Sequence, residues 1–313
     1  MIIAVGAAGA CGSRDANGPI GLTSIVVTPN PQIVGVGVTR PFTATGSNDL
    51  GAPLALTADW SVNHGGGTIN ASTGMFTAGT DTGTFTNTVK AASGAVFGEA
   101  TVIVTDDATL LAPGPLRSAS ANGIMAGQAF TCVTGGTINA NIAISPGSTV
   151  TGFPPCVITG VRHLADAIAL ASQNDLTAAY DSLMGLPCPG ANVITTDLGA
   201  TTKAAGVYCS SSGIGVTGTL TLDAGNDTSA TFVFQAQSTL ITAGNVVLIN
   251  GAKAHNVYWV VGSSATLGTS SQWQGNVIAL TSITLVDNAN LTGRALARNG
   301  SVSLGTNNTI TLP

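Results

Sequence analysis

Charged side chains are scarce in this 313-residue chain. They make up 7% of its residues, against roughly 25% in an average soluble domain. The 9 basic residues form no cluster, and the 14 acidic residues give a net charge of −5. Without a basic patch the chain has no electrostatic footprint for nucleic acid, so we exclude DNA and RNA as partners.

Strong helix formers are also few. Glu99 is the only glutamate, and lysine and glutamine are scarce. β-Branched residues recur instead in short alternating runs, which favours strands over helices. The hydrophobic content of 44% is enough for a packed core. The chain is therefore predicted to be mainly β.

The sequence lacks the motifs of catalysis and of metal binding. His64, His163 and His255 are scattered, with no HExxH spacing and no CxxC. The acids of the second half are all aspartates, and no two form a carboxylate pair of the kind used in glycoside cleavage. Asp223 and Asp227 flank a turn, where such residues commonly bond the backbone. We predict that the chain is not an enzyme and has no metal or cofactor.

The first eleven residues are apolar and small. They lead into Cys11-Gly12-Ser13, which resembles the end of a lipoprotein signal with Cys11 as the lipidation candidate. The run is too short to span a bilayer and lacks a basic start, so a truncated signal peptide or an ordinary apolar N-terminus is the alternative. The prediction is an exported protein, at the cell surface or extracellular, that meets a membrane only through a lipid anchor.

Short alternating strands punctuated by turns fill residues 22–107, following an N-terminal signal-like segment and linker at 1–21. This pattern is typical of a small β-sandwich. The segments at 25–29 (IVVTP), 42–45 (FTAT), 60–62 (WSV) and 74–79 (GMFTAG) resemble, in this order, bacterial immunoglobulin-like domains. The resemblance implies a spacer or adhesin module with Trp60 in its core.

Residues 108–115 carry two prolines and a glycine, the composition of a short linker. From 116 to 313, apolar triplets return at similar intervals, which indicates internal repeats. Thr266 and Thr284 are 18 residues apart, a length that fits a three-sided parallel β-solenoid. An apolar stripe at helical spacing predicts one amphipathic helix over about 161–184, packed alongside the solenoid.

The second part also carries short segments in a distinctive order. They are ISPG at 144–147, TGFPP at 151–155, GVYC at 206–209, LTLDA at 220–224, FVFQ at 232–235, NVYW at 256–259, GNVIA at 275–279 and GRALA at 293–297. In this order they resemble the bacterial ice-binding β-solenoid family. The resemblance covers nearly all of 116–313 and implies ice binding, as an antifreeze or an ice adhesin.

Ice binding requires a rigid, flat and sparsely charged surface of hydroxyl and methyl groups. Stacked coils repeat such groups about every 4.7–4.9 Å. Aligning the coils on their apolar triplets brings into register four tetrads, at 242–245, 269–272, 287–290 and 306–309. The ice-binding candidates from these tetrads are Thr242, Asn245, Thr269, Ser271, Asn288, Asn290, Thr306, Asn307 and Thr309. The first and last tetrads resemble the Thr-small-any-Thr/Asn motif of some family members, whereas Asp287 departs from it. The alternative is that these are the turn residues that any solenoid needs at its corners.

The cysteines other than Cys11 form an even set of four, which in an exported protein favours disulfides. Three pairings are possible. We prefer Cys188 with Cys209, which would join the helix exit to the solenoid, and Cys132 with Cys156, which would close the first coil. Both disulfides would be structural.

A structural or adhesive role is the alternative function. The last coil, at 309–313, shows no evident capping element, and an uncapped solenoid end invites stacking or strand addition. The expected partner is therefore ice or another extended surface, with copies of the chain as the alternative. Carbohydrate binding is a weaker alternative.

Overall fold

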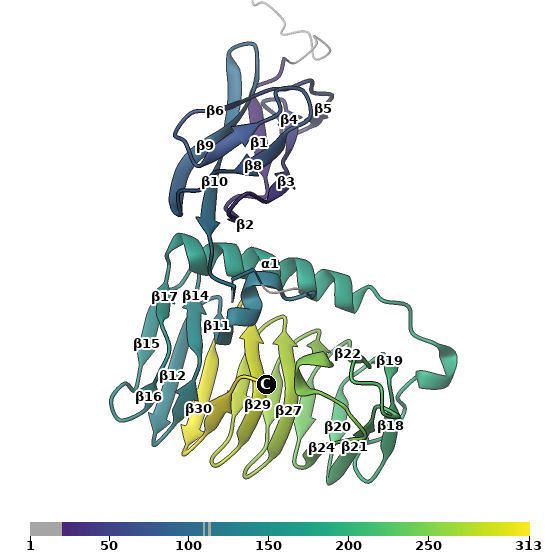
Figure 1. The fold of residues 1–313 in the computed structure, drawn as a ribbon. Coiled ribbons are helices and arrows are strands. Elements are labelled where there is room, and N and C mark those ends of the chain that lie inside the picture. Colours follow the sequence, from purple (N-terminus) through teal and green to yellow (C-terminus); the bar gives the residue numbers. More distant parts are fainter. Residues whose placement is uncertain (1–20, 109, 112–113) are drawn as a thin grey trace, which may run out of the picture.

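The computed structural model describes residues 21–108, 110–111 and 114–313. An N-terminal β domain lies above a long solenoid of parallel coils, and one long helix lies between them (Figure 1). The mainly β fold, with a parallel solenoid and a helix packed alongside, is confirmed. The lipidation candidate Cys11 lies outside the described residues.

Short strands surround one apolar core in the N-terminal domain. They form the sheets β1-β4-β5, β2-β10-β9-β6 and β3-β8-β7. Phe42, Trp60 and Phe76 fill the core, so Trp60 is a core residue, as expected. The immunoglobulin-like relationship stays a prediction. The strands are β1 (Ser24–Thr28), β2 (Gln32–Gly35), β3 (Thr39–Pro41), β4 (Thr43–Ser47), β5 (Pro53–Leu54), β6 (Asp59–Val62), β7 (Gly67–Ile69), β8 (Met75–Ala78), β9 (Gly83–Ser93) and β10 (Val96–Thr105).

Two solenoid coils precede the helix, and the remaining coils follow it. The first group comprises η1 (Arg117–Ala121), β11 (Asn122–Ala126), β12 (Ala129–Thr134), β13 (Thr137–Asn139), β14 (Asn141–Ile144), β15 (Thr149–Thr151), β16 (Val157–Ile158) and β17 (Arg162–Leu164). The helix is α1 (Ala167–Met184). The second group comprises η2 (Gly190–Asn192), β18 (Thr202–Ala204), β19 (Gly206–Ser210), β20 (Ile214–Val216), β21 (Thr219–Asp223), β22 (Phe232–Ala236), β23 (Leu240–Thr242), β24 (Asn245–Ile249), η3 (Ala254–Asn256), β25 (Val257–Val261), β26 (Ala265–Leu267), β27 (Gln272–Ala279), β28 (Ile283–Leu285), β29 (Asn290–Ala297), β30 (Val302–Thr306) and β31 (Thr309–Thr311).

The coils do not stack in sequence order. The first coil pairs with the last, because β11, β12 and β13 lie in parallel register beside β29, β30 and β31. In Figure 1 the teal strands of the first coils therefore stand against the yellow strands of the C-terminal coil. The expectation that the last coil is an uncapped end is wrong, because the two coils that precede α1 cover it.

Helix α1 carries the chain from these two coils to the far end of the solenoid (Figure 1). It begins at Ala167, not near 161, because Arg162–Leu164 pairs with β14 as strand β17. Asp166 caps the helix, and its Oδ1 accepts a hydrogen bond from the Ala169 amide at 2.7 Å. Leu176, Ala179 and Leu183 are buried with the outward side chains of the sheet beneath the helix. The predicted helix is confirmed, with a corrected start.

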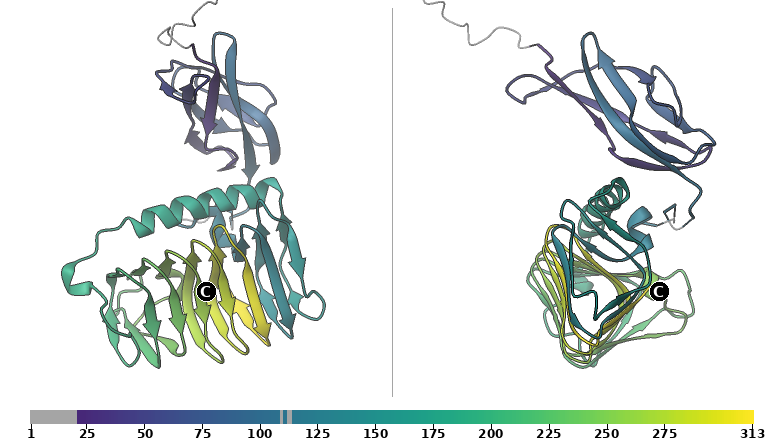
Figure 2. Two further views of the ribbon diagram at one scale, coloured as in Figure 1. Left: turned by 180° about the vertical axis from the view of Figure 1, so that it is seen from behind. Right: turned by 90° about the vertical axis from the view of Figure 1, so that its left-hand side faces the viewer.

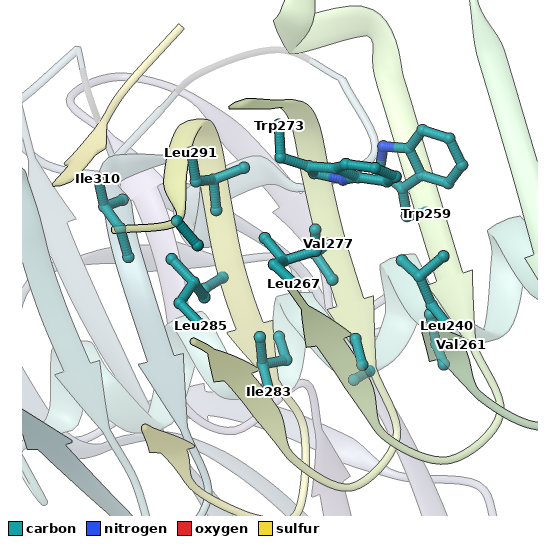
Figure 3. Close-up of a cluster of buried hydrophobic side chains, with 14 of the residues drawn as sticks. Leu240, Trp259, Val261, Leu267, Trp273, Val277, Ile283, Leu285, Leu291 and Ile310 are labelled. Atoms are coloured by element: carbon teal, nitrogen blue, oxygen red, sulfur yellow. The ribbon is translucent and has the colours of Figure 1, made fainter. Parts of the chain in front are cut away.

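The solenoid interior is an apolar column along which rings stack from coil to coil. Phe234 and Trp259 are stacked with centroids 4.2 Å apart, and Trp259 and Trp273 lie 4.8 Å apart. Figure 3 shows both tryptophans beside the aliphatic side chains of neighbouring strands, including Leu267. Because each coil adds residues to one continuous column, the core fixes the register of every coil.

The N-terminal domain rests on α1. Ile33 and Ile103 of that domain are buried against Ala171 of the helix. Next to this contact, the Asn174 side-chain amide donates to the Asn30 carbonyl at 3.1 Å. The N-terminal domain thus sits on the helix side of the solenoid (Figure 2).

Two disulfides tie the coils. Cys132 is bonded to Cys156, and Cys188 is bonded to Cys209. These are the preferred pairs. The first joins the two coils that cover the C-terminal coil, and the second joins the segment after α1 to β19.

Replacing Cys188 and Cys209 together with serine is expected to destabilise the chain. The disulfide closes a 21-residue separation, and loss of such a closed loop typically costs about 2–4 kcal/mol of unfolding free energy. Chemical denaturation measures the difference. Wild type under reducing conditions is the control and should be at least as destabilised, because it loses both disulfides. A double variant as stable as oxidised wild type would contradict the prediction.

Replacing Asp166 with alanine is expected to remove the N-cap of α1. Loss of a helix N-cap costs about 0.5–2 kcal/mol, and the change also removes the 2.9 Å contact between Asp166 Oδ2 and His163 Nδ1. Thermal unfolding should show a lower midpoint. Ser182→Ala, an exposed position late in the same helix, is the matched control. Equal midpoints for the two variants would count against the capping role.

Candidate functional site

The solenoid has three faces, and its coils overlap in outline when viewed end-on (Figure 2, right). The helix face lies under α1. The third face is built from β18, β21, β24, β31, β13, β16 and the first halves of β27 and β29. The remaining face is the outward side of the seven-stranded sheet β15-β12-β30-β28-β26-β23-β20. We call it the ranked face, because its outward side chains form a line across the strands.

Glycine makes the corner between the third face and the helix face. Gly275 and Gly293 lie opposite each other in the register of β27 and β29, with φ of 108° and 155°. A Cβ on Gly293 would lie 1.9 Å from the Gly275 carbonyl oxygen. Only glycine allows the backbones to approach this closely where both strands bend.

On the ranked face, side chains alternate strictly between core and solvent. Leu267, Ile283 and Leu285 point into the core. Each strand contributes one outward residue to a single line, because parallel pairing keeps these residues in register. The line runs, strand by strand, through Gly215, Ile241, Thr266, Thr284, Ser303, Thr131 and Thr151.

This central rank is rich in hydroxyl groups and open to solvent. Hydroxyl side chains occupy its five consecutive positions from Thr266 to Thr151. Thr284 and Thr151 are exposed, and Thr266, Ser303 and Thr131 are half-buried. Neighbouring strands lie about 4.7–4.9 Å apart, so the hydroxyls and threonine methyls repeat at nearly that interval.

A second line of serines borders the rank where the strands begin. Ser264 Oγ accepts from the Ser282 amide at 3.3 Å, and Ser282 Oγ accepts from the Ser301 amide at 3.2 Å. These bonds link one coil to the next through side chain and backbone. They hold the edge of the ranked face rigid.

The strands of the ranked face carry no Asp, Glu, Lys, Arg or His. Two carboxylates that bond turn amides lie beside it, and a Cβ on Gly215, at one end of the central rank, would lie 2.7 Å from Asp197 Oδ2. Asp287 Oδ1 accepts from the Thr306 amide at 2.7 Å. Asp197 Oδ1 accepts from the amides of Gly199 and Thr217 at 2.7 and 2.9 Å. Burial opposes ionisation of Asp197, yet these hydrogen bonds outweigh it and hold its pKa below the ordinary value.

The third face carries a different rank, made of amides and hydroxyls. Asn245 Oδ1 accepts from the Gln272 amide at 2.8 Å, and Asn290 Oδ1 accepts from the Thr309 amide at 2.9 Å. These asparagines thus form a ladder that joins successive coils. The candidates Asn245, Asn290 and Thr309 lie in this rank, where the asparagines have a structural bond.

The other candidates lie at the corner between the ranked face and the third face. Ice contact is a wrong prediction for Thr242 and Ser271, because each is only 2% exposed. Asn288 and Asn307 have φ of 61° and 55°, so they are left-handed turn residues. Thr269 belongs to the same turns, whereas Thr306 is the last residue of β30 and pairs with Thr134 of β12. The tetrads therefore trace a corner and not a flat face.

Sequence reasoning missed the central rank although it quoted the residues. The triplets Ala265-Thr266-Leu267 and Ile283-Thr284-Leu285 served only to align the coils. In a strand, however, the residue between two buried neighbours points to the opposite side. The period of two within each triplet was the signal that could have found Thr266 and Thr284.

In the part of the chain that the structure describes, no group of three or more His, Cys, Asp or Glu residues could hold a metal ion. The three histidines are dispersed, and His163 Nδ1 bonds Asp166. No helix within 21–108, 110–111 and 114–313 is long and apolar enough to cross a membrane.

The second part of the chain is similar to known proteins. Residues 124–311 match the family model described as Ice-binding-like. An ice-binding protein of Nostoc sp. (strain HG1) is 45% identical over 195 residues, which are 61% of this chain and 72% of that protein. Ice-binding protein 1 of Shewanella frigidimarina (strain NCIMB 400) is 36% identical over 160 residues, 49% of this chain but only 18% of that protein.

Solved structures agree with the sequence matches. The crystal structure of an ice-binding protein from an Antarctic biological consortium aligns with a TM-score of 0.62 at 41% identity, covering 64% of this chain and 92% of that one. That of an ice-binding protein from the Antarctic ascomycete Antarctomyces psychrotrophicus aligns with a TM-score of 0.60 at 39% identity, covering 63% and 97%. Since the family model spans more than half of the chain, this protein belongs to the ice-binding-like family.

Proposed function

We propose that this protein binds ice through the ranked face. The observation that carries the proposal is the line of hydroxyls from Thr266 to Thr151, held in register across consecutive strands of an uncharged sheet. The relatives with the same fold are named ice-binding proteins. Their names support ice as the ligand, and the geometry supports the ranked face as the surface that binds it.

Hydroxyl and methyl groups at a fixed spacing suit an ordered water lattice. A threonine side chain offers one hydrogen-bonding group and one methyl, and its β-branch restricts rotation about χ1. The packed core beneath Thr266 and Thr284 holds the strands in place. Little conformational entropy is therefore lost when an extended surface is bound.

The ranked face is free to meet such a surface. The N-terminal domain packs against α1 through Ile33 and Ile103, and α1 covers a different face. Ile241 in the central rank is 59% exposed. An ice surface could thus contact this face without displacing either the helix or the N-terminal domain.

We also propose that the protein is exported and that it binds without catalysing a reaction. The N-terminal β domain would act as a spacer between the N-terminal segment at 1–21 and the solenoid. Support for a binding role comes from the aspartates, because Asp197, Asp223 and Asp227 accept hydrogen bonds from turns. Those bonds lower the pKa of all three carboxyl groups, which disfavours their use as general acids.

Replacing Thr266 and Thr284 together with tyrosine is expected to abolish most of the thermal hysteresis and of the inhibition of ice recrystallisation. The two bulky rings would stand above the central rank and hold a flat surface away from it. Thr292→Tyr on the third face, outward and exposed, is the matched control and should retain wild-type activity. Circular dichroism checks that both variants fold.

Three results would contradict the proposal. Wild-type protein that leaves ice growth unchanged at high concentration would exclude ice as the ligand. Full activity in the Thr266→Tyr/Thr284→Tyr variant would exclude the ranked face. Loss of activity in Thr292→Tyr alone would assign ice binding to the third face.

A further inference from the structure

Arg294 of β29 is a buried cation on the helix side of the solenoid. Its side chain is 8% exposed. Nε donates to the Ser120 carbonyl and Nη1 donates to Asn276 Oδ1, both at 2.8 Å. No carboxylate within the described residues forms an ion pair with it, and Nη2 makes no hydrogen bond there.

The neighbouring Arg298, unlike Arg294, forms an ion pair with a carboxylate. Arg298 Nη1 pairs with Asp181 Oδ1 at 3.0 Å, and its Nε donates to Thr177. A buried charge without a counterion is costly, whereas a guanidinium and a carboxylate match each other's geometry. Burial lowers the pKa of Arg294 to about 10, so the group is still charged at neutral pH. Binding of an anion beside Arg294 would therefore be favourable, because it would give the buried charge a counterion.

A hollow of about 560 Å³ lies beside Arg294, within the range of roughly 300–1,000 Å³ usual for small-molecule sites. Tyr258 and Arg294 share its floor, because the register Tyr258–Asn276–Arg294 puts both on the same outward line of the sheet. Its walls are largely apolar and include Leu116, Leu183 and Leu186. None of the described residues that line it is acidic.

This combination selects for a particular ligand chemistry. The one unbonded nitrogen of Arg294 favours a single carboxylate over a polyanion. The leucines and the Tyr258 ring favour an apolar body attached to that carboxylate. We propose that the hollow between η1, the end of α1 and β25 binds a small monocarboxylate with an apolar body, paired to Arg294.

The site is separate from the ranked face. It opens on the side that carries α1 and η1, whereas Thr266 and Thr284 belong to another sheet. Its occupation therefore leaves the proposed ice-binding surface unchanged, and either proposal can fail without the other.

Titration calorimetry of the full chain at pH 7 tests the proposal with hexanoate, 1-hexanol and acetate. Hexanoate should bind to a single site, and both comparison ligands should bind about tenfold more weakly or worse, since each lacks one half of the recognition. Arg294→Gln should weaken hexanoate binding by at least about tenfold because it removes the charge. Arg298→Gln is the matched control and should leave the affinity unchanged.

A second variant keeps the test decisive if Arg294→Gln does not fold. Ser120→Asp retains Arg294 and adds a carboxylate at a residue that lines the same hollow. This internal carboxylate should compete with hexanoate, weaken its binding by about tenfold or more, and raise the thermal midpoint. Absence of hexanoate binding to wild type at millimolar concentration would overturn the proposal. Hexanol or acetate binding as tightly as hexanoate, or unchanged affinity in Ser120→Asp, would overturn it as well.

Discussion

The parallel register between coils is the constraint on which the rest of this structure depends. Main-chain hydrogen bonds hold neighbouring strands about 4.7–4.9 Å apart, and every outward side chain inherits that interval. The central rank through Thr266, Thr284 and Ser303 exists only because these residues are partners in register. A slip of one residue would turn each of them into the core.

Packing in the core holds the coils in this register, and the first coil extends the same register past the C-terminal coil. Rings such as Phe234 and Trp259 stack from one coil to the next, so a shifted coil would lose its contacts on both sides. At the C-terminal coil the partners come from residues far away in sequence, because β12 pairs with β30. Helix α1 makes this closure possible, since it carries the chain along the whole stack before the remaining coils return.

Polar side chains at the corners stabilise the fold through hydrogen bonds to the backbone. Asn245 and Asn290 bond the backbone of the next coil, while Asp287 caps a turn. Asn288 and Asn307 provide left-handed turns that few other residues adopt. In a solenoid such residues recur at every coil whatever its function. Recurrence of Thr, Asn and Ser therefore indicates a repeat but does not by itself locate a binding face.

Local pattern determined much of this protein from the sequence alone. Strand content, repeat length and the presence of α1 follow from composition, spacing and apolar periodicity, which are properties of short segments. The sequence left three cysteine pairings possible, and the two disulfides are seen in the structure. The tertiary structure decided the start of α1 at Ala167, the burial of Thr242 and Ser271, and the pairing of β12 with β30. It also decided which outward residues form one line, because Thr266, Thr284 and Ser303 become neighbours only once their strands are paired in register. Those features depend on contacts between residues far apart in the chain, and the spacing of residues along one chain does not encode which coils become neighbours.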